Sequence, residues 1–363
     1  MKILQVIPNL ETGGAQKLLE YIISFLKKKN EVELVVFKRN DTEIEKAIEN
    51  YGVKVHYLNI SNRSPKAIFK LRQYIKKSDV VHVHLFPANY YSVFANLRIR
   101  KPLFFTEHST HNKRRNHSWL RRLEIWIYRH FTEIICISND TQRNLECWTK
   151  GKLMPERLTV IENGINLKIF ENKDSDKSIK EIFGRGGVPL LMISRFVASK
   201  DQATLVRSLK LIDNEEVFIA FAGDGPDRQN VEKLAIELGL NDRVVFLGQR
   251  NDIPDLIQKS YIGVQSSNWE GFGLTAVEMM GGGLPVIASN VHGLDKIVEG
   301  AGLLFEKGNE YDLAQQINSL LKDNEFYKKI KVRCLNRSQN YSIEKTAERY
   351  LGLYNKAFKT SSF

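Results

Sequence analysis

Short apolar runs alternate with stretches of helical spacing along the first half of the chain. In residues 16–28 and 64–77, apolar side chains recur at every third or fourth position, as on one face of a helix. The other runs are apolar throughout, which is typical of strands buried on both faces. These predicted strands are Ile3–Ile7, Val32–Phe37, Val53–Leu58, Val80–Val83, Leu103–Thr106, Ile134–Ser138 and Leu158–Ile161. Strand–helix alternation of this kind builds a parallel, doubly wound sheet.

The pattern restarts after a polar, glycine-bearing segment, residues 171–187, which we interpret as a linker and the entry to a second domain. Strands are predicted at 189–194, 217–222, 244–247, 262–265 and 286–288, and helices at 202–211, 228–238, 253–259 and after Gly273. Residues 311–358 have a helical pattern throughout. The sequence therefore predicts an α/β protein of two Rossmann-like domains, 1–168 and 169–342, with a C-terminal helix near 343–363 that joins the first. Ligands of such domains bind beyond the carboxyl ends of the strands, so we expect a site in a cleft between facing domains.

The composition is that of a globular protein, because 42% of the 363 residues are hydrophobic and 26% are charged. No apolar run approaches the length that crosses a bilayer, and the N-terminus lacks the layout of a signal peptide. The three cysteines, Cys136, Cys147 and Cys334, are widely spaced. This spacing argues against a disulfide framework or a zinc site, and it fits a reducing cytoplasm.

The positive charge is confined to one half of the chain. Residues 1–165 carry the whole formal net charge of +12, and the remainder is balanced. A sided positive field attracts an anionic partner, and charge alone admits nucleic acid, anionic lipid or a phosphorylated acceptor. Within this half, Lys113–Arg129 interleaves basic and aromatic residues, and Lys66–Lys77 is similar. Two interpretations stay open for the first segment: a membrane-interface helix, or a basic helix whose apolar face is core.

The segment Ser267–Glu278 follows a predicted strand and opens into a predicted helix. Glycines let a backbone approach a ligand closely, and free N–H groups at a helix start attract phosphate oxygens. Glu270 and Glu278 flank this turn, so one can contact a sugar and the other a ribose diol. Glu278 stands among apolar residues, where a carboxylate needs a partner. The alternative is that both are ordinary glutamates, one at a helix N-terminus and one within the helix.

Other candidate residues also follow predicted strands. Arg195 and Lys200 can grip a diphosphate and stabilise it as it departs, although an isolated pair of loop cations is often only solvated. The turn Ala222–Pro226 is at least as consistent with a tight loop as with ligand contact, and the loop after Phe246 can frame a nucleobase.

Glycines and histidines supply further candidates in the first half. Gly13 and Gly14 form either a diphosphate contact or a plain strand-to-helix turn, and they do not make a G-x-G-x-x-G fingerprint. His108 follows a predicted strand and can orient a sugar hydroxyl, or it is a hydrogen-bonded loop residue. His82 and His84 share one face of a strand, and without a third ligand we expect core residues, not a metal site.

Taken in order, these segments resemble the retaining glycosyltransferases of family 4, which have the GT-B fold. The resemblance covers nearly the whole chain. The matching motifs are G-G-A at Gly13–Ala15, T-E-H at Thr106–His108, I-E-N-G-I at Ile161–Ile165, R-x4-K at Arg195–Lys200, A-G-D-G-P at Ala222–Pro226 and E-G-F-G-L-x3-E at Glu270–Glu278. One departure is Gly281–Gly283, where many members carry an alanine–cysteine–glycine or similar turn, and there we expect a looser turn.

The resemblance implies metal-independent transfer from a nucleotide sugar, UDP-linked in preference to GDP-linked, with retained anomeric configuration and no further cofactor. By position, Arg195 and Lys200 would hold the diphosphate and Glu278 the ribose. Glu270 and His108 would contact the donor sugar. The other nucleotide-sugar-binding residues implied in this way are Gly14, Gly271, Phe272, Gly273 and Leu274.

We therefore predict a hexosyltransferase that acts on a glycan or lipid-linked acceptor in the biosynthesis of cell-surface polysaccharide, lipopolysaccharide or glycolipid. The basic first half predicts that it lies at the inner face of the cell membrane, in contact with an anionic surface. A GT-B-fold sugar-nucleotide epimerase is the alternative enzyme. A non-enzymatic nucleic-acid binder is suggested only by the pI of about 9.4, and the chain carries no recognised nucleic-acid module.

Overall fold

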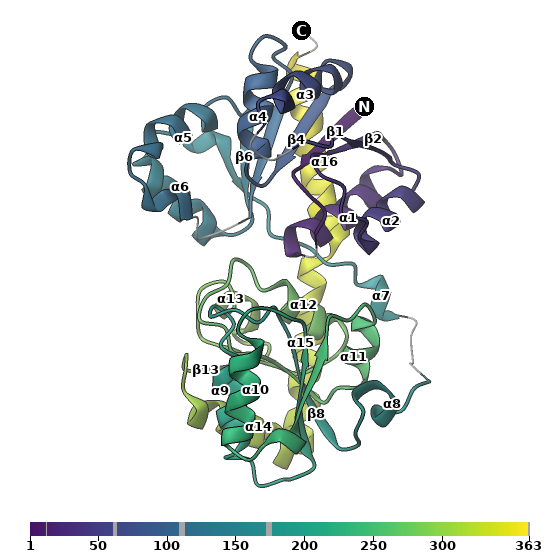
Figure 1. The fold of residues 1–363 in the computed structure, drawn as a ribbon, viewed down its shortest axis with the longest axis vertical. Helices are drawn as coiled ribbons and strands as arrows, with labels where there is room; N and C mark the ends of the chain where they lie inside the picture. Colours follow the sequence, from purple (N-terminus) through teal and green to yellow (C-terminus); the bar gives the residue numbers. More distant parts are fainter. Residues whose placement is uncertain (12, 61–63, 109–112, 172–175, 362–363) are drawn as a thin grey trace. The chain divides into compact units, whose positions relative to one another are not determined.

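The computed structural model describes residues 1–11, 13–60, 64–108, 113–171 and 176–361 (Figure 1). The chain forms two compact units. Unit 1 joins residues 1–164 with residues 343–363, and unit 2 comprises residues 165–342. The polar segment 171–187, interpreted above as a linker, belongs to unit 2, and its residues 172–175 lie outside the described part of the chain.

Unit 1 is built on a seven-stranded sheet in the order β3-β2-β1-β4-β5-β6-β7, with every pair of neighbours parallel. Its strands are β1 (Lys2–Ile7), β2 (Glu31–Val36), β3 (Lys54–Tyr57), β4 (Val80–His84), β5 (Leu103–Glu107), β6 (Glu133–Cys136) and β7 (Leu158–Val160). The order reverses between β1 and β4, so the carboxyl ends of these two central strands form the switch point where doubly wound sheets bind ligands.

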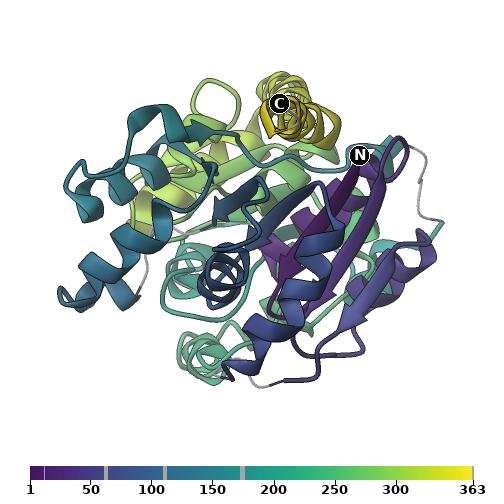
Figure 2. The same cartoon turned by 90° about the horizontal axis from the view of Figure 1, so that it is seen from above.

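The helices of unit 1 cover both faces of this sheet. They are α1 (Gly14–Leu26), α2 (Glu43–Asn50), α3 (Lys66–Lys77), α4 (Ala88–Asn96), α5 (Leu120–Tyr128), α6 (Asn139–Thr149) and α16 (Ile343–Ser361). Side chains of α1, α2 and α16 pack in one apolar cluster with the sheet, and those of α3 to α6 pack in a second cluster. Figure 2 shows α16, in yellow, on the opposite side of the strands from the blue helices. The last helix of the chain therefore completes the first unit.

Unit 2 repeats the architecture with a six-stranded parallel sheet in the order β10-β9-β8-β11-β12-β13. Its strands are β8 (Val188–Ile193), β9 (Val217–Ala222), β10 (Val244–Gly248), β11 (Ile262–Gln265), β12 (Val286–Ser289) and β13 (Leu303–Phe305). Its helices are α7 (Lys168–Glu171), α8 (Ile179–Phe183), α9 (Gln202–Leu209), α10 (Arg228–Glu237), α11 (Ile253–Lys259), α12 (Leu274–Gly281), α13 (Asp295–Val298), α14 (Glu310–Lys322) and α15 (Asn324–Ser338).

The predicted fold class is confirmed, since each predicted strand occurs in one of two doubly wound parallel sheets. Strand β13 was not anticipated, because its three-residue apolar run is too short to distinguish from a loop. Helix α8 lies inside the predicted linker, where Ser178 and Glu181 form a capping box that starts a helix in polar sequence. The helical C-terminal stretch breaks twice, at Asp323 between α14 and α15 and again between Gln339 and Ser342.

We expect replacement of Tyr354 by Ala to destabilise unit 1 strongly. Tyr354 on α16 is fully buried against the sheet, and removing a buried aromatic side chain costs about 3–5 kcal/mol. Urea unfolding followed by circular dichroism measures the change. Tyr311→Ala is the matched control, because Tyr311 is 70% exposed and its loss should change the free energy of unfolding little. Equal effects of the two variants would contradict the role assigned to α16.

Candidate active site

The loops that leave β8 and β11 are tied to each other through main-chain atoms. Asn268 donates its backbone N–H to the Ser199 carbonyl and its side-chain N–H to the Ala198 carbonyl, both at 2.8 Å. The buried Ser266 hydroxyl donates to the Asp201 carbonyl at 2.8 Å. These bonds fix the β8 loop against the β11 loop.

Lys200 and Glu270 meet across these two loops. The Lys200 ammonium forms an ion pair with Oε1 of Glu270, and the Ser267 hydroxyl donates to the same oxygen at 3.0 Å. The two side chains are only 20% and 11% exposed. The sequence placed both residues in one site but gave no indication that they pair. A bound anion can displace Glu270 from Lys200, because an ammonium has three donors and can reorient.

Arg195 lies on the same β8 loop with its side chain exposed. Within the described ranges, no carboxylate pairs with its guanidinium. The buried Gln202 supports its backbone. The side-chain N–H groups of Gln202 donate to the Arg195 carbonyl and to the Ser194 hydroxyl, both at 3.0 Å. Sequence reasoning missed Gln202, because nothing in the hydrophobic pattern distinguishes it from a solvated helix residue. The arrangement leaves Arg195 available to a ligand on a rigid loop.

The glycines of Ala222–Pro226 support the interpretation of this segment as a tight loop. A Cβ atom on Gly223 would lie 2.0 Å from the Ser194 carbonyl oxygen, and one on Gly225 would lie 2.3 Å from the Phe196 carbonyl oxygen. Both glycines have positive φ, at +138° and +159°. They let the β9 loop press against the backbone that flanks Arg195.

Helix α12 begins at the glycine-rich turn without a side-chain cap. Its N-cap is Gly273, with φ of +86°, and a Cβ there would meet Leu294 Cδ2 at 2.7 Å. Phe272 is buried, with its ring edge-on to Tyr341 at 5.5 Å between centroids, so it can offer a ligand only its backbone. The turn from Gly271 to Leu274 is therefore suited to binding an anion through N–H groups.

Gly293 was not singled out from the sequence, yet it supports the same turn. It has φ of +91°, and a Cβ there would lie 2.7 Å from the Glu270 carbonyl oxygen. The Ser289 hydroxyl donates to the Ser267 carbonyl at 2.5 Å. The loop after β12 thus also packs against the backbone of the segment that carries Glu270.

Helix α12 leaves Glu278 less buried than its neighbours in sequence. The neighbours Ala276, Val277, Met279 and Met280 are buried, but Glu278 is partly exposed. Helical spacing explains the difference, because Glu278 shares the partly exposed face of α12 with Leu274, one turn nearer the helix start. Glu278 therefore lies on the same face as the residues at the beginning of α12.

The expected looser turn at Gly281–Gly283 is not found. A Cβ on Gly282 would lie 2.2 Å from Ile257 Cγ2, and one on Gly281 would lie 2.8 Å from Leu167 Cδ2. The first two glycines let α12 end in close contact with apolar side chains.

Gly14 is the exposed first residue of α1, directly after the carboxyl end of β1 and its loop. This helix also lacks a side-chain cap and has no acidic residue in its first turn. A Cβ on the preceding Gly13 would lie 2.6 Å from Oε1 of Gln16, and Thr12 is outside the described residues. The position fits both an anion contact and a plain turn, so the two interpretations stay open.

His108 lies just beyond β5 and contacts a second histidine. Its Nε2 is 3.1 Å from Nδ1 of His84. His82 and His84 are fully buried, and His82 is hydrogen-bonded to Thr106 and Tyr354, which confirms the expected core position. Desolvation lowers the pKa of His82 and of His108 to about 3. No group of three or more His, Cys, Asp or Glu residues in the described ranges is arranged to hold a metal ion.

The basic segment Lys113–Arg129 has a buried inner side and an exposed outer side. On its inner side, Glu124 is fully buried and accepts from Arg114 Nε at 2.9 Å and from Trp148 Nε1 at 2.7 Å. Arg115 pairs with the buried Glu107 at 2.9 Å. On the outer side, Trp119 is 75% exposed and Trp126 is also exposed. Buried ion pairs thus anchor the segment, and its aromatic edge faces solvent.

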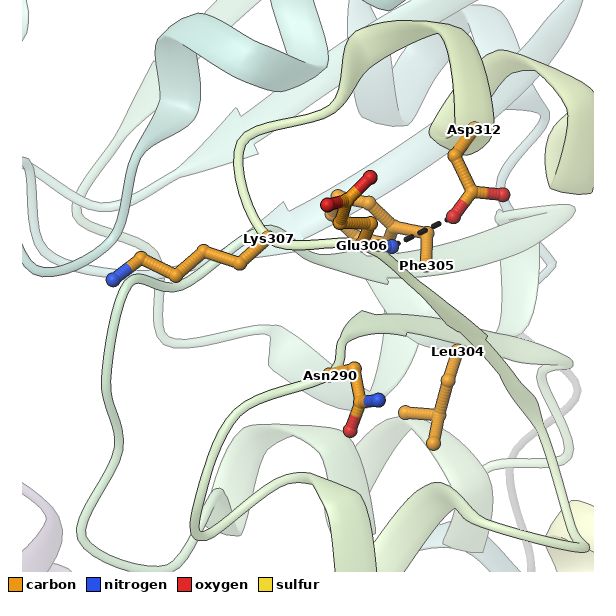
Figure 3. A pocket seen from close by; sticks show the side chains of 6 residues that line it. All are labelled: Asn290, Leu304, Phe305, Glu306, Lys307 and Asp312. Carbon is orange, nitrogen blue, oxygen red and sulfur yellow. Dashed lines mark hydrogen bonds between the residues drawn. The ribbon is translucent and has the colours of Figure 1, made fainter.

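A separate pocket of about 450 Å³ lies at the carboxyl ends of β12 and β13 (Figure 3). Its lining residues are Asn290, Leu304, Phe305, Glu306, Lys307 and Asp312. Asp312 accepts a hydrogen bond from the Glu306 backbone at 2.7 Å. None of the predicted site residues lines it.

Two family models match the chain. The model described as Glycosyltransferase Family 4 matches residues 12–169, and the model described as Glycosyl transferases group 1 matches residues 175–334. Between them they account for most of both units.

The relatives and solved structures that resemble the chain include named glycosyltransferases and a protein solved with UDP and glucose. The chain is 27% identical over 315 residues to UDP-Gal:alpha-D-GlcNAc-diphosphoundecaprenol alpha-1,3-galactosyltransferase of Escherichia coli, covering 80% of this chain and 79% of that protein. It is 24% identical over 371 residues to an undecaprenol-linked glycan alpha-1,4-N-acetyl-D-galactosaminyltransferase of Campylobacter jejuni, covering 97% and 98%. The structure of HepE from Anabaena with UDP and glucose superposes with a TM-score of 0.87 at 22% identity, covering 98% of this chain and all of that one.

Across the described ranges, no helix is both long enough and apolar enough to cross a membrane.

We expect acidification to destabilise the protein through its buried histidines. In the folded state His82 and His108 stay neutral down to about pH 3, whereas the unfolded chain takes up these protons near the ordinary pKa of 6.5. The unfolded state therefore binds more protons between these pH values. The free energy of unfolding should fall as pH falls through this window, by up to about 1.4 kcal/mol per pH unit for each histidine.

Urea unfolding at pH 7, 6 and 5 measures this slope. His82→Gln should reduce it by the share of one histidine. His292→Gln, which removes an imidazole that is 80% exposed, should leave it unchanged. A slope that is the same in all three proteins would contradict the assignment.

Proposed function

Because the chain belongs to the group 1 glycosyltransferases, we propose that it transfers a sugar from a UDP-linked donor to a glycan or lipid-linked acceptor. The product would be part of a cell-surface polysaccharide, lipopolysaccharide or glycolipid. The named activities of relatives in Escherichia coli and Campylobacter jejuni support this proposal, because both act on glycans carried by a polyprenyl diphosphate. Family membership favours transfer over the epimerase alternative.

The pairing of Lys200 with Glu270 beside the exposed Arg195 is the observation that carries the proposal. Two cations and one carboxylate, held on tied loops, match the charges of a sugar diphosphate. A diphosphate would draw Lys200 away from Glu270, since two phosphates offer more negative charge than one carboxylate. Glu270 would then accept hydrogen bonds from the sugar hydroxyls.

We propose that catalysis is electrostatic and retains the anomeric configuration. Arg195, Lys200 and the N–H groups that begin α12 would stabilise the charge that develops on the departing diphosphate. Because these groups supply positive charge themselves, the proposal requires no divalent cation. A phosphate oxygen of the donor would take the acceptor proton on the same face of the sugar, which retains the configuration. Glu278 would bind the ribose, Gly14 would approach the diphosphate, and His108 would hydrogen-bond the sugar.

We expect UDP to raise the melting temperature more than GDP does, because a ligand that binds only the folded state stabilises it. Lys200→Ala should abolish this stabilisation and lower kcat/KM for a UDP-sugar by about 100-fold or more, as loss of a preorganised transition-state donor does. Arg207→Ala is the matched control, because it removes an exposed cation from α9 in the same unit.

The donor and its base are tested together by a panel of UDP- and GDP-sugars with a polyprenyl-diphosphate glycan acceptor. Formation of an epimer from the donor alone would overturn the transferase proposal. Stabilisation by GDP but not UDP would overturn the choice of base.

We further propose that unit 1 docks on an anionic membrane surface through one edge. This aromatic–basic edge consists of the exposed side chains Phe94, Leu97, Arg98, Trp119, Arg122, Leu123, Trp126 and Arg129. The rings of Phe94 and Trp126 are 5.5 Å apart, which joins α4 to α5 in one surface. Tryptophan, leucine and arginine together suit the interface between lipid headgroups and acyl chains.

Vesicle co-sedimentation tests the docking edge. Binding to vesicles with anionic lipid should exceed binding to neutral vesicles, and it should weaken with added salt. Trp119→Ala combined with Leu123→Ala should reduce it several-fold, because both side chains lose apolar area that enters the interface. Ile236→Ala, an exposed apolar residue in unit 2, is the control. Equal binding to neutral and anionic vesicles would contradict the proposal.

A further inference from the structure

A chain of buried polar side chains crosses the three central strands of unit 1 and ends at His108. Gln5 on β1 and His84 on β4 are fully buried, on the face of the sheet that α16 covers. Oε1 of Gln5 is 2.9 Å from Nε2 of His84, and Nδ1 of His84 is 3.1 Å from Nε2 of His108. Each member thus contacts the next through one specific atom.

With the Gln5 amide oriented as in the structure, these contacts imply one order of protons along the chain. The amide oxygen of Gln5 can only accept, so Nε2 of His84 must donate and carries the proton. A neutral His84 then has its lone pair on Nδ1, and the hydrogen bond to His108 must be donated by Nε2–H of His108. A neutral His108 is left with its lone pair on Nδ1.

We propose that Gln5 and His84 are positioning residues that set the tautomer of His108, so that His108 presents Nδ1 to the substrate as a hydrogen-bond acceptor. This inference rests on the proposed contact between His108 and the transferred sugar. It assigns that contact a direction: a sugar hydroxyl donates and the imidazole accepts. In a neutral histidine, the hydrogen bond made by one ring nitrogen decides whether the other nitrogen carries the proton.

The surroundings keep the whole chain neutral, as the proposal requires. Burial lowers the pKa of His84 well below its ordinary value. His108 is partly exposed, but the surrounding protein desolvates its ring and lowers its pKa to about 3. A group this weakly basic does not remove a proton from a hydroxyl at neutral pH. This low pKa agrees with a role for His108 in orienting a hydroxyl.

Heteronuclear NMR of protein with 15N-labelled histidine tests the tautomers directly, without substrate. The expected result is a protonated Nε2 and an unprotonated Nδ1 in both His84 and His108. A proton on Nδ1 of His108 would overturn the proposal, whatever the enzyme's activity. Because this measurement uses the unaltered protein, it does not depend on a variant that folds.

A variant then connects the tautomer to the substrate. Gln5→Met removes the acceptor at similar volume, and we expect a mixture of tautomers at His84 and His108. kcat/KM for sugar transfer should fall by about tenfold or less, as for one neutral hydrogen bond. The affinity for UDP, which lacks the transferred sugar, should not change.

Tyr350→Phe is the matched control. The Tyr350 hydroxyl is buried on the same face of the sheet and lies 3.4 Å from Oγ1 of Thr106, so its loss removes a polar group outside the chain from Gln5 to His108. It should change neither the tautomers nor kcat/KM. An altered tautomer in Gln5→Met with unchanged kcat/KM would overturn the positioning role. Failure of every nucleotide sugar to react would refute the proposed function, while the NMR result still decides the proton order.

Discussion

Backbone contact between neighbouring loops is the constraint on which the candidate site depends. The loops after β8, β9 and β11 touch main chain to main chain, and the glycines at 223 and 225 permit this approach. Arg195 stands on one loop and Lys200 near its end, while Glu270 stands on another. Because the loops cannot move independently without breaking these hydrogen bonds, the charged side chains keep their positions relative to one another. A site of this kind is rigid before any ligand arrives, which is what electrostatic catalysis requires.

The two units share a doubly wound parallel sheet but differ in where their polar residues lie. Unit 2 gathers its charged candidates on the loops that follow its strands. Unit 1 places histidines within the sheet itself, where His82 is hydrogen-bonded to Thr106 and to Tyr354 of α16, and His84 to Gln5. Buried polar groups of this kind are tolerated only when they are hydrogen-bonded, so the last helix of the chain is part of the electrostatics of the first sheet.

The hydrophobic pattern was sufficient to predict both sheets, because strands buried on two faces leave an unbroken apolar signal. It failed where the signal was weak, at the three residues of β13 and at α8 within polar sequence. Candidate residues after strands were also found, since position along the chain implies position at a sheet edge. The contacts between these residues could not be predicted, because the pairing of Lys200 with Glu270 and the support from Gln202 depend on loop packing. The partial exposure of Glu278 does not follow from its apolar neighbours in sequence, because neighbours in sequence are not neighbours on a helix face.

The return of α16 to unit 1 has a consequence for biosynthesis. Unit 2 is continuous in sequence and has all its parts once residue 342 has left the ribosome. Unit 1 emerges first, but one face of its sheet is covered only by α1 and α2 until α16 follows. The nascent chain therefore carries an open apolar surface throughout the translation of unit 2, and the unit made second can reach its native state before the unit made first. Protection of that surface on the ribosome would fall to chaperones, because exposed apolar surface is prone to aggregation.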